Sequence, residues 1–127
     1  MSWPVTTDTE GNILTIDSNG NMTVTSADGT VTVENPDGTI STTDAEGNSV
    51  TVSPDGTVTT TNSDGTITTT DAEGNSVTAS PDGSTSVTDS EGNTMTTDSE
   101  GNNIYTSPDG TVTIESPDGT TTTTGPD

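Results

Sequence analysis

Glycine recurs at every ninth position from Gly11 to Gly119, without a single insertion or deletion, and only Gly125 of the 14 glycines falls outside this series. An unstructured chain tolerates insertions and deletions, whereas a fixed period indicates a structural unit of fixed length. Hydrophobic residues make up only 20% of the chain and the formal net charge is -21, which by themselves are typical of disorder. The regular glycines instead predict a folded repeat protein.

Each of these glycines ends a short polar stretch such as SADG, NPDG, DAEG or SPDG. Proline or a small residue followed by Asp or Glu suits the centre of a type I turn, and glycine adopts the left-handed conformation that follows it. Between the turns lie short runs such as TVTVE and SVTVS, whose Thr and Val favour a strand. The sequence therefore predicts one array of nine-residue strand-turn units over residues 1–127.

A second period of 27 residues is superimposed on the first. It is carried by the asparagines that follow a glycine and by aspartates that precede one. The two sets are Asn21, Asn48, Asn75 and Asn102, and Asp28, Asp55, Asp82 and Asp109. A meander reverses direction at every strand, so its natural superperiod holds an even number of strands, whereas a three-sided coil needs three. The period favours an all-β, three-sided parallel β-solenoid with 27 residues per coil, and the alternative is a single-layer antiparallel meander of nine-residue strands.

The parity of the aliphatic positions leads to the same preference. Counted from each glycine, Val31, Ile40 and Val58 take odd positions, whereas Val50 and Val77 take even ones, and each parity is kept one period later. A solenoid would bury all of these side chains, and a meander would spread them over both faces of a sheet. Six further apolar residues fall on positions that would point outward from the solenoid, so that either the register slips there or those surfaces meet a partner. They are Leu14, Ile16, Met22, Val24, Met95 and Tyr105.

The composition excludes several classes of function. The chain has no Lys, Arg or His, so it lacks the positive charge that nucleic-acid binding requires. No apolar run approaches the roughly 20 residues of a membrane span. Without Cys or His, the usual nucleophile and base pairs are absent, and we expect no enzymatic activity and no required cofactor.

Aspartates 27 residues apart would stack at one corner of a solenoid. Like charges at that spacing repel, and a hard cation such as Ca²⁺ would compensate them. Stacking would also raise the pKa of these carboxyl groups, so that mild acidification would stabilise the fold. The candidate metal ligands are Asp28, Asp55, Asp82 and Asp109.

Threonines at alternate positions would form ranks on two outer faces of such a solenoid. They resemble the threonine ranks of insect-type and other β-solenoid ice-binding proteins, which implies binding to ice or to a mineral surface. The candidate surface-binding residues are Thr30, Thr32, Thr57, Thr59, Thr111 and Thr113 on one face, and Thr39, Thr66 and Thr68 on the next.

Three known families share features of the repeat. The strings NPDGT, SPDGT and NSDGT resemble the nine-residue repeats of centriolar G-box domains, which implies a free-standing antiparallel sheet that binds a partner peptide. The nine-residue length is similar to that of RTX-type β-rolls, but single glycines replace their glycine pairs, so no calcium ligands carry over. DAEGN and DSEGN resemble turns of bacterial RHS/YD repeats, and the near-identical blocks also resemble an artificial, designed repeat.

We therefore expect a non-catalytic structural protein, a rod or fibre-forming subunit that self-associates end to end or edge to edge, because open strand edges pair with other copies. The alternatives are an ice- or mineral-binding solenoid and a peptide-binding single-layer sheet. For a natural protein we expect an extracellular or surface-exposed location.

Overall fold

The computed structural model describes residues 5–126, which form an all-β structure of short strands and tight turns. The chain divides into two compact units, the first ending at Ser63 and the second beginning at Asp64. The strands of unit one are β1 (Val5–Thr7), β2 (Ile13–Ile16), β3 (Met22–Thr25), β4 (Val31–Glu34), β5 (Ile40–Thr43), β6 (Ser49–Val52) and β7 (Val58–Thr61). Those of unit two are β8 (Ile67–Thr70), β9 (Ser76–Ala79), β10 (Thr85–Thr88), β11 (Thr94–Thr97), β12 (Asn103–Thr106), β13 (Val112–Glu115) and β14 (Thr121–Thr124).

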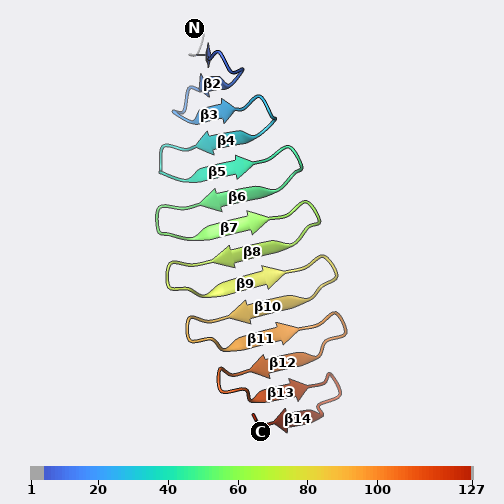
Figure 1. Cartoon of the computed structure of the whole chain (residues 1–127). Helices are drawn as coiled ribbons and strands as arrows, with labels where there is room; N and C mark the ends of the chain where they lie inside the picture. The colour runs from blue at the N-terminus through green and yellow to red at the C-terminus, as the bar shows by residue number, and fades with distance from the viewer. Residues whose placement is uncertain (1–4, 127) are drawn as a thin grey trace. The chain divides into compact units, whose positions relative to one another are not determined.

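Within each unit every strand pairs antiparallel with the next strand along the chain, so the alternative of a single-layer meander is confirmed (Figure 1). The three-sided parallel solenoid is wrong. Val31, for example, pairs with Thr43 of the neighbouring strand and not with Val58, which lies one 27-residue period away. Because three strands are an odd number, residues 27 apart lie on strands of opposite direction, and the longer period has no counterpart in the pairing.

The turns explain why the chain reverses direction at every strand. In the turn from Ser53 to Thr57, the Ser53 N–H donates to the Thr57 carbonyl (2.9 Å) and the Gly56 N–H donates to the Ser53 carbonyl (3.0 Å). This is a type I turn followed by a left-handed glycine, which is the usual closure of a three-residue hairpin loop. The thirteen glycines of the series have φ between +89° and +97°, so the predicted turn chemistry is confirmed.

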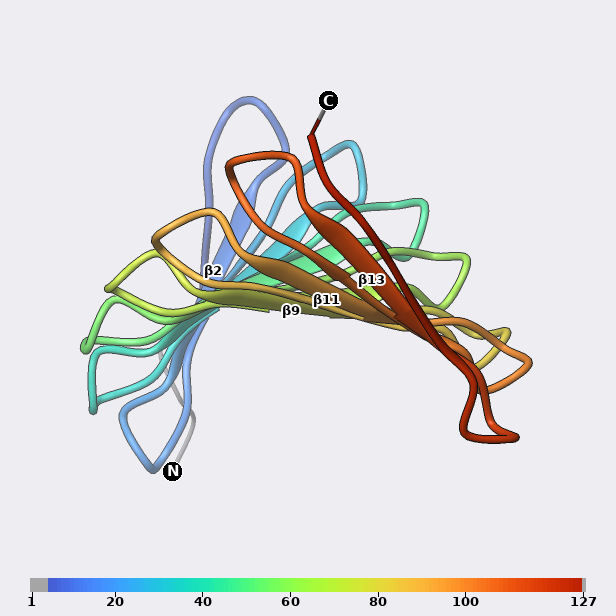
Figure 2. The same cartoon turned by 90° about the horizontal axis from the view of Figure 1, so that it is seen from below.

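No hydrophobic side chain among the described residues is buried, and the sheet has no core. Val50, expected inside a coil, is 38% exposed, and the other residues of its strand are either exposed or half-buried. Figure 2 shows the reason, since each unit is a single layer of strands without a second layer against it. Backbone ladders and contacts between side chains on adjacent strands therefore provide most of the stability.

The aliphatic side chains lie on both faces of each unit, but unevenly. In unit one, the apolar face carries Leu14, Ile16, Met22, Val24, Ile40, Val50, Val52 and Val58. In unit two, the apolar face carries Ile67, Val77, Ala79, Val87, Met95 and Tyr105. The opposite faces are richer in Thr and Ser, so each unit has one face better suited to contact a partner.

Two glycines in equivalent turns allow a test of the backbone geometry. Gly65 and Gly83 have nearly the same φ, +96° and +95°, but a Cβ at Gly65 would lie 3.0 Å from the Pro81 side chain, whereas nothing lies within 4 Å of a Cβ at Gly83. We expect Gly83→Ala to lose about 1–2 kcal/mol of unfolding free energy through backbone strain alone. Gly65→Ala should lose more, because the Pro81 ring must also move.

Urea denaturation of the two variants measures this difference. Equal losses of unfolding free energy in the two variants would show that the contact between the added Cβ at position 65 and the Pro81 ring costs nothing.

Candidate functional site

The predicted metal ligands occupy the turns and hold them together. The Oδ1 atom of each aspartate accepts a hydrogen bond from the backbone N–H two residues later, at 2.8–2.9 Å. The donors to Asp28, Asp55, Asp82 and Asp109 are Thr30, Thr57, Ser84 and Thr111. These short local bonds are the contacts by which aspartate stabilises turns.

The expected ladder of these four carboxylates does not form. Asp28 lies in the turn between β3 and β4, and Asp55 lies in the turn between β6 and β7, three strands away and therefore at the opposite ends of the strands. Asp82 and Asp109 are separated in the same way in unit two. No cluster of three or more acidic side chains suited to a metal ion is found in residues 5–126. Calcium binding by these carboxylates stays a prediction, without the ladder that suggested it.

A second class of turn has aspartate at its first position and asparagine at its last. In the turn from Asp44 to Asn48, the Asp44 Oδ1 atom accepts the N–H groups of Glu46 (2.9 Å) and Asn48 (2.9 Å), and its Oδ2 atom accepts the Asn48 Nδ2–H (3.0 Å). The same arrangement recurs in the turns that begin at Asp8, Asp17, Asp71, Asp89 and Asp98. Each of these carboxylates therefore accepts three hydrogen bonds within its own turn.

These hydrogen bonds determine the titration of the aspartates. The Asn48 side chain and then its backbone N–H lower the pKa of Asp44 below the ordinary value of 3.8. The Thr57 backbone N–H lowers the pKa of Asp55 in the same direction. The expectation that mutual repulsion raises these pKa values is wrong, because the predicted stacking is absent and every aspartate within residues 5–126 accepts bonds that favour its charged form.

The threonine ranks are also divided by the antiparallel pairing. Thr32 lies opposite Thr42 on the face that carries Val50 and Thr60, so Thr59 points to the other face of unit one. In unit two, Thr68 and Thr113, which were expected on different faces, do lie on different faces. The expected rank that joins Thr32 and Thr59 on one face is wrong, because antiparallel pairing places these two side chains on opposite faces.

The threonines have two structural roles instead. Thr30, Thr39, Thr57, Thr66 and Thr111 follow a glycine and donate their N–H to a turn aspartate. Thr32 and Thr68 form hydroxyl pairs with Thr42 (3.3 Å) and Thr78 (3.2 Å), and Thr113 pairs with Thr123 (3.2 Å). Such cross-strand contacts each contribute about 0.2–1 kcal/mol to the stability of a sheet. Whether these threonines also bind a surface stays a prediction.

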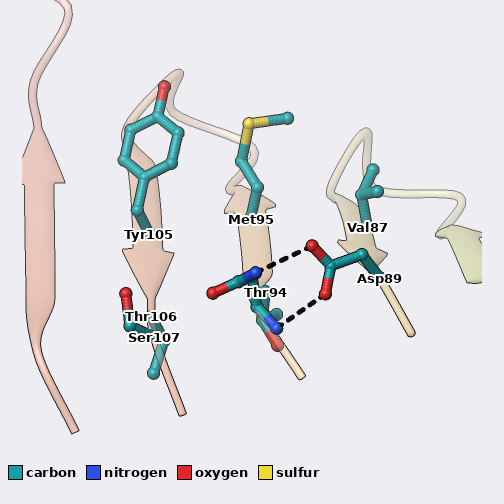
Figure 3. Close-up of a pocket in the computed structure, with 8 residues that line it drawn as sticks. Val87, Asp89, Thr94, Met95, Tyr105, Thr106 and Ser107 are labelled. Atoms are coloured by element: carbon teal, nitrogen blue, oxygen red, sulfur yellow. Dashed lines mark hydrogen bonds between the residues drawn. The ribbon is translucent and has the colours of Figure 1, made fainter. Parts of the chain in front are cut away.

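A hollow of about 380 Å³ opens on the apolar face of unit two. A row of three side chains from adjacent strands forms its floor, because Val87 lies opposite Met95 and Met95 lies opposite Tyr105. Figure 3 shows the three side chains pointing to the same side of the sheet. Met95 and Tyr105 are 38% and 40% exposed. We name this hollow, lined by Val87, Asp89, Asn93, Thr94, Met95, Tyr105, Thr106 and Ser107, the Tyr105 hollow.

Turn residues form the polar side of the Tyr105 hollow. Asp89 accepts the Asn93 backbone N–H (2.9 Å) and the Asn93 Nδ2–H (2.8 Å), which are drawn as dashed lines in Figure 3. These bonds fix the orientation of the Asn93 amide. The hollow thus combines an aromatic ring, two aliphatic or thioether side chains and an aspartate, a set that suits an apolar group next to a positive charge.

Sequence reasoning singled out Met95 and Tyr105 only as apolar residues on outward positions. Their position next to Val87 could not be recognised, because the solenoid register placed Val87 in a different row. The visible signal was a Met and the only Tyr of the chain at positions where many other repeats carry Thr or Ser.

No helix in the described part of the chain is long and apolar enough to cross a membrane.

Neither a protein-family model nor a curated protein matches the sequence. Solved structures do match the fold. The TCP10 domain of Danio rerio CPAP, in complex with a peptide of STIL from the same organism, has a TM-score of 0.79 and 24% identity over 96% of this chain and 68% of that chain. The SAS-4 (dCPAP) TCP domain of Drosophila melanogaster, in complex with a proline-rich motif of Ana2 (dSTIL), has a TM-score of 0.73 and 18% identity over 95% and 88% of the two chains.

A third structure is the G-box domain of the microcephaly protein CPAP, for which a role in centriole elongation is suggested. It has a TM-score of 0.59 and 19% identity over 99% of this chain and 100% of that chain. These likenesses place the fold with the G-box, or TCP, domains and confirm the resemblance that the PDG turns suggested.

The direction of the aspartate pKa values predicts how stability depends on pH. Groups whose pKa is lowered in the folded state stabilise the fold above their unfolded pKa, and this stabilisation is lost as the pH falls through the folded value. We expect the melting temperature to be level near neutral pH and to fall progressively below about pH 4. Circular dichroism melts at constant ionic strength measure it, and a melting temperature that rises on acidification would show that charge repulsion dominates.

Proposed function

We propose that this chain is a non-catalytic binding scaffold whose Tyr105 hollow holds an extended, positively charged peptide that contains proline. The observation that carries the proposal is the exposed row of Val87, Met95 and Tyr105 on a sheet that has no core to bury it. Exposed apolar groups gathered in one place indicate a contact surface for a partner. Tyrosine and methionine are enriched in such surfaces.

The charge of the chain supports a basic partner. With 21 acidic residues and no Lys, Arg or His, the protein attracts cationic segments and repels acidic ones. Asp89 brings a carboxylate to the rim of the hollow. A basic residue next to an apolar anchor would therefore find a matching pair of groups.

Two structural neighbours support the choice of an extended, proline-containing peptide. One was solved with a peptide of STIL and the other with a proline-rich motif of Ana2. Proline-rich segments adopt an extended helix before binding, so they lose little entropy when they dock on an aromatic side chain. The single layer of strands around the hollow leaves such a segment room to lie across several strands.

The test uses a synthetic peptide in which arginine and proline alternate around one leucine, and a control peptide with glutamate in place of arginine. Binding is read from the amide NMR shifts of β11 and β12. We expect Tyr105→Thr to weaken binding at this hollow about tenfold or more, as the loss of an aromatic anchor does. Ile104→Thr, which alters the opposite face of the same strand, should leave it unchanged.

Saturable shifts with the arginine peptide and none with the glutamate peptide support the proposal. Equal effects of the Tyr105 and Ile104 variants would contradict it, as would equal binding of the two peptides.

A second proposed activity is association through the outer strands, which would produce the rod or fibre. β14 consists of four exposed threonines, and β1 is exposed throughout. Neither described strand contains Pro, Lys or another charged residue that would oppose pairing with a second copy. The edge of β14 can therefore add a strand from another chain.

Because the net charge of -21 opposes self-association, we expect the average mass in light scattering to rise with added NaCl, which screens the repulsion. Thr122→Glu together with Thr124→Glu should abolish this rise. The same two changes on an inner strand, at Thr94 and Thr96, add equal charge and should preserve it. A mass that stays monomeric at every salt concentration would contradict edge association.

A further inference from the structure

A second hollow, of about 290 Å³, lies on the apolar face of unit one. Its lining residues are Thr6, Asp8, Asn12, Ile13, Leu14 and Val24, and we name it the Leu14 hollow. Its floor is again a row across three adjacent strands, because Thr6 lies opposite Leu14 and Leu14 lies opposite Val24. The two hollows thus have the same kind of floor, a row of three side chains on adjacent strands.

The correspondence extends to every lining residue of the smaller hollow. Each residue of the Leu14 hollow lies nine repeats before a residue that lines the Tyr105 hollow. The pairs are Thr6 and Val87, Asp8 and Asp89, Asn12 and Asn93, Ile13 and Thr94, Leu14 and Met95, and Val24 and Tyr105. In both places the turn that precedes the central strand belongs to the aspartate and asparagine class.

The polar rim has the same geometry in both hollows. Asp8 accepts the Asn12 backbone N–H (3.0 Å) and the Asn12 Nδ2–H (2.9 Å), as Asp89 does with Asn93. The Asn12 side chain also lowers the pKa of Asp8, as Asn93 lowers that of Asp89, so each rim carries a negative charge at neutral pH. Both hollows therefore offer apolar side chains beside a carboxylate.

From this equivalence we propose that the Leu14 hollow is a second binding site for the same kind of partner, an extended basic peptide segment with an apolar anchor. This inference rests on the proposed function of the Tyr105 hollow. It commits to a cationic occupant because the chain holds no positive side chain that could neutralise the Asp8 rim. One chain then binds two segments, and a partner that carries two of them gains avidity if its linker spans the sites.

The two sites differ in their floors. Val24 stands where the first site has Tyr105, and Thr6 stands where it has Val87, so the Leu14 hollow has less apolar surface and no ring. Removing an aromatic anchor commonly weakens binding tenfold or more. The second site therefore binds the same peptide about tenfold more weakly.

They also differ in one hydrogen-bond acceptor. Asn12 Oδ1 accepts the Ala27 backbone N–H (3.3 Å), from the turn two hairpins further along the chain. The Oδ1 atoms of Asn48 and Asn75 accept the equivalent hydrogen bond from the backbone N–H groups of Ser63 and Ser90. For Asn93 the equivalent residue is Pro108, which has no N–H, and no described residue donates to Asn93 Oδ1. In the Tyr105 hollow the Asn93 Oδ1 atom can therefore accept a hydrogen bond from an arginine or lysine of the partner. In the Leu14 hollow the Asn12 Oδ1 atom already accepts the Ala27 N–H.

The experiment titrates the wild-type chain with the same arginine, proline and leucine peptide by calorimetry, together with amide NMR shifts of β1 to β3 and of β11 to β12. We expect two peptides per chain and saturable shifts in both regions. Leu14→Thr should leave one peptide per chain and remove only the shifts in β1 to β3. Val24→Thr, on the neighbouring strand, should give the same result, and circular dichroism verifies that both variants remain folded.

Ile16→Thr is the matched control, because Ile16 lies on the same strand and face as Leu14 but does not line the hollow. It should retain two peptides per chain. One peptide per chain in the wild type, with shifts confined to β11 and β12, would overturn the second site and leave the proposed function standing. Absence of shifts in both regions would overturn the proposed function as well. Equal losses from Leu14→Thr and Ile16→Thr would show that the hollow is not the site.

Discussion

The hydrogen bonds that close each turn are the interaction on which the rest of this structure depends. In the turn from Ser53 to Thr57, two backbone hydrogen bonds and one hydrogen bond to the Asp55 carboxylate reverse the chain, so that the next strand lies beside the previous one. Because no side chain among the described residues provides a buried core, the register of every ladder derives from its turns. The aspartates therefore have a structural role in the turns, and the negative charge that they give the protein is a secondary consequence.

A sheet without a core leaves its apolar side chains available. Met95 and Tyr105 would be buried in a two-layer protein, where they would stabilise the fold. Here they remain about two-fifths exposed, next to a turn that supplies a carboxylate. A partner that covered these two side chains would gain the free energy of burying apolar surface that folding leaves exposed.

The repeat also explains how one chain comes to have two similar hollows. At both hollows a turn of the aspartate and asparagine class precedes the central strand, which carries Leu14 in the first case and, nine repeats later, Met95 in the second. The differences at Val24 and Tyr105, and at Ala27 and Pro108, then set the two sites apart. Repetition supplies the framework, and single substitutions within it make the two hollows differ.

The sequence by itself determined the local structure: the nine-residue unit, the type I turn, the left-handed glycine and the strand between turns all depend on contacts within a few residues. It also marked Leu14, Val24, Met95 and Tyr105 as apolar residues in unusual positions. Only the tertiary structure decided how the strands pair. Parity and the 27-residue period favoured the solenoid because they assume that aliphatic side chains seek a common interior, whereas the hairpin bonds reverse the chain at each turn. That reversal separated Asp28 from Asp55 and placed Leu14 beside Val24 and Met95 beside Tyr105, because antiparallel pairing between adjacent strands, and not spacing along the chain, determines which side chains meet.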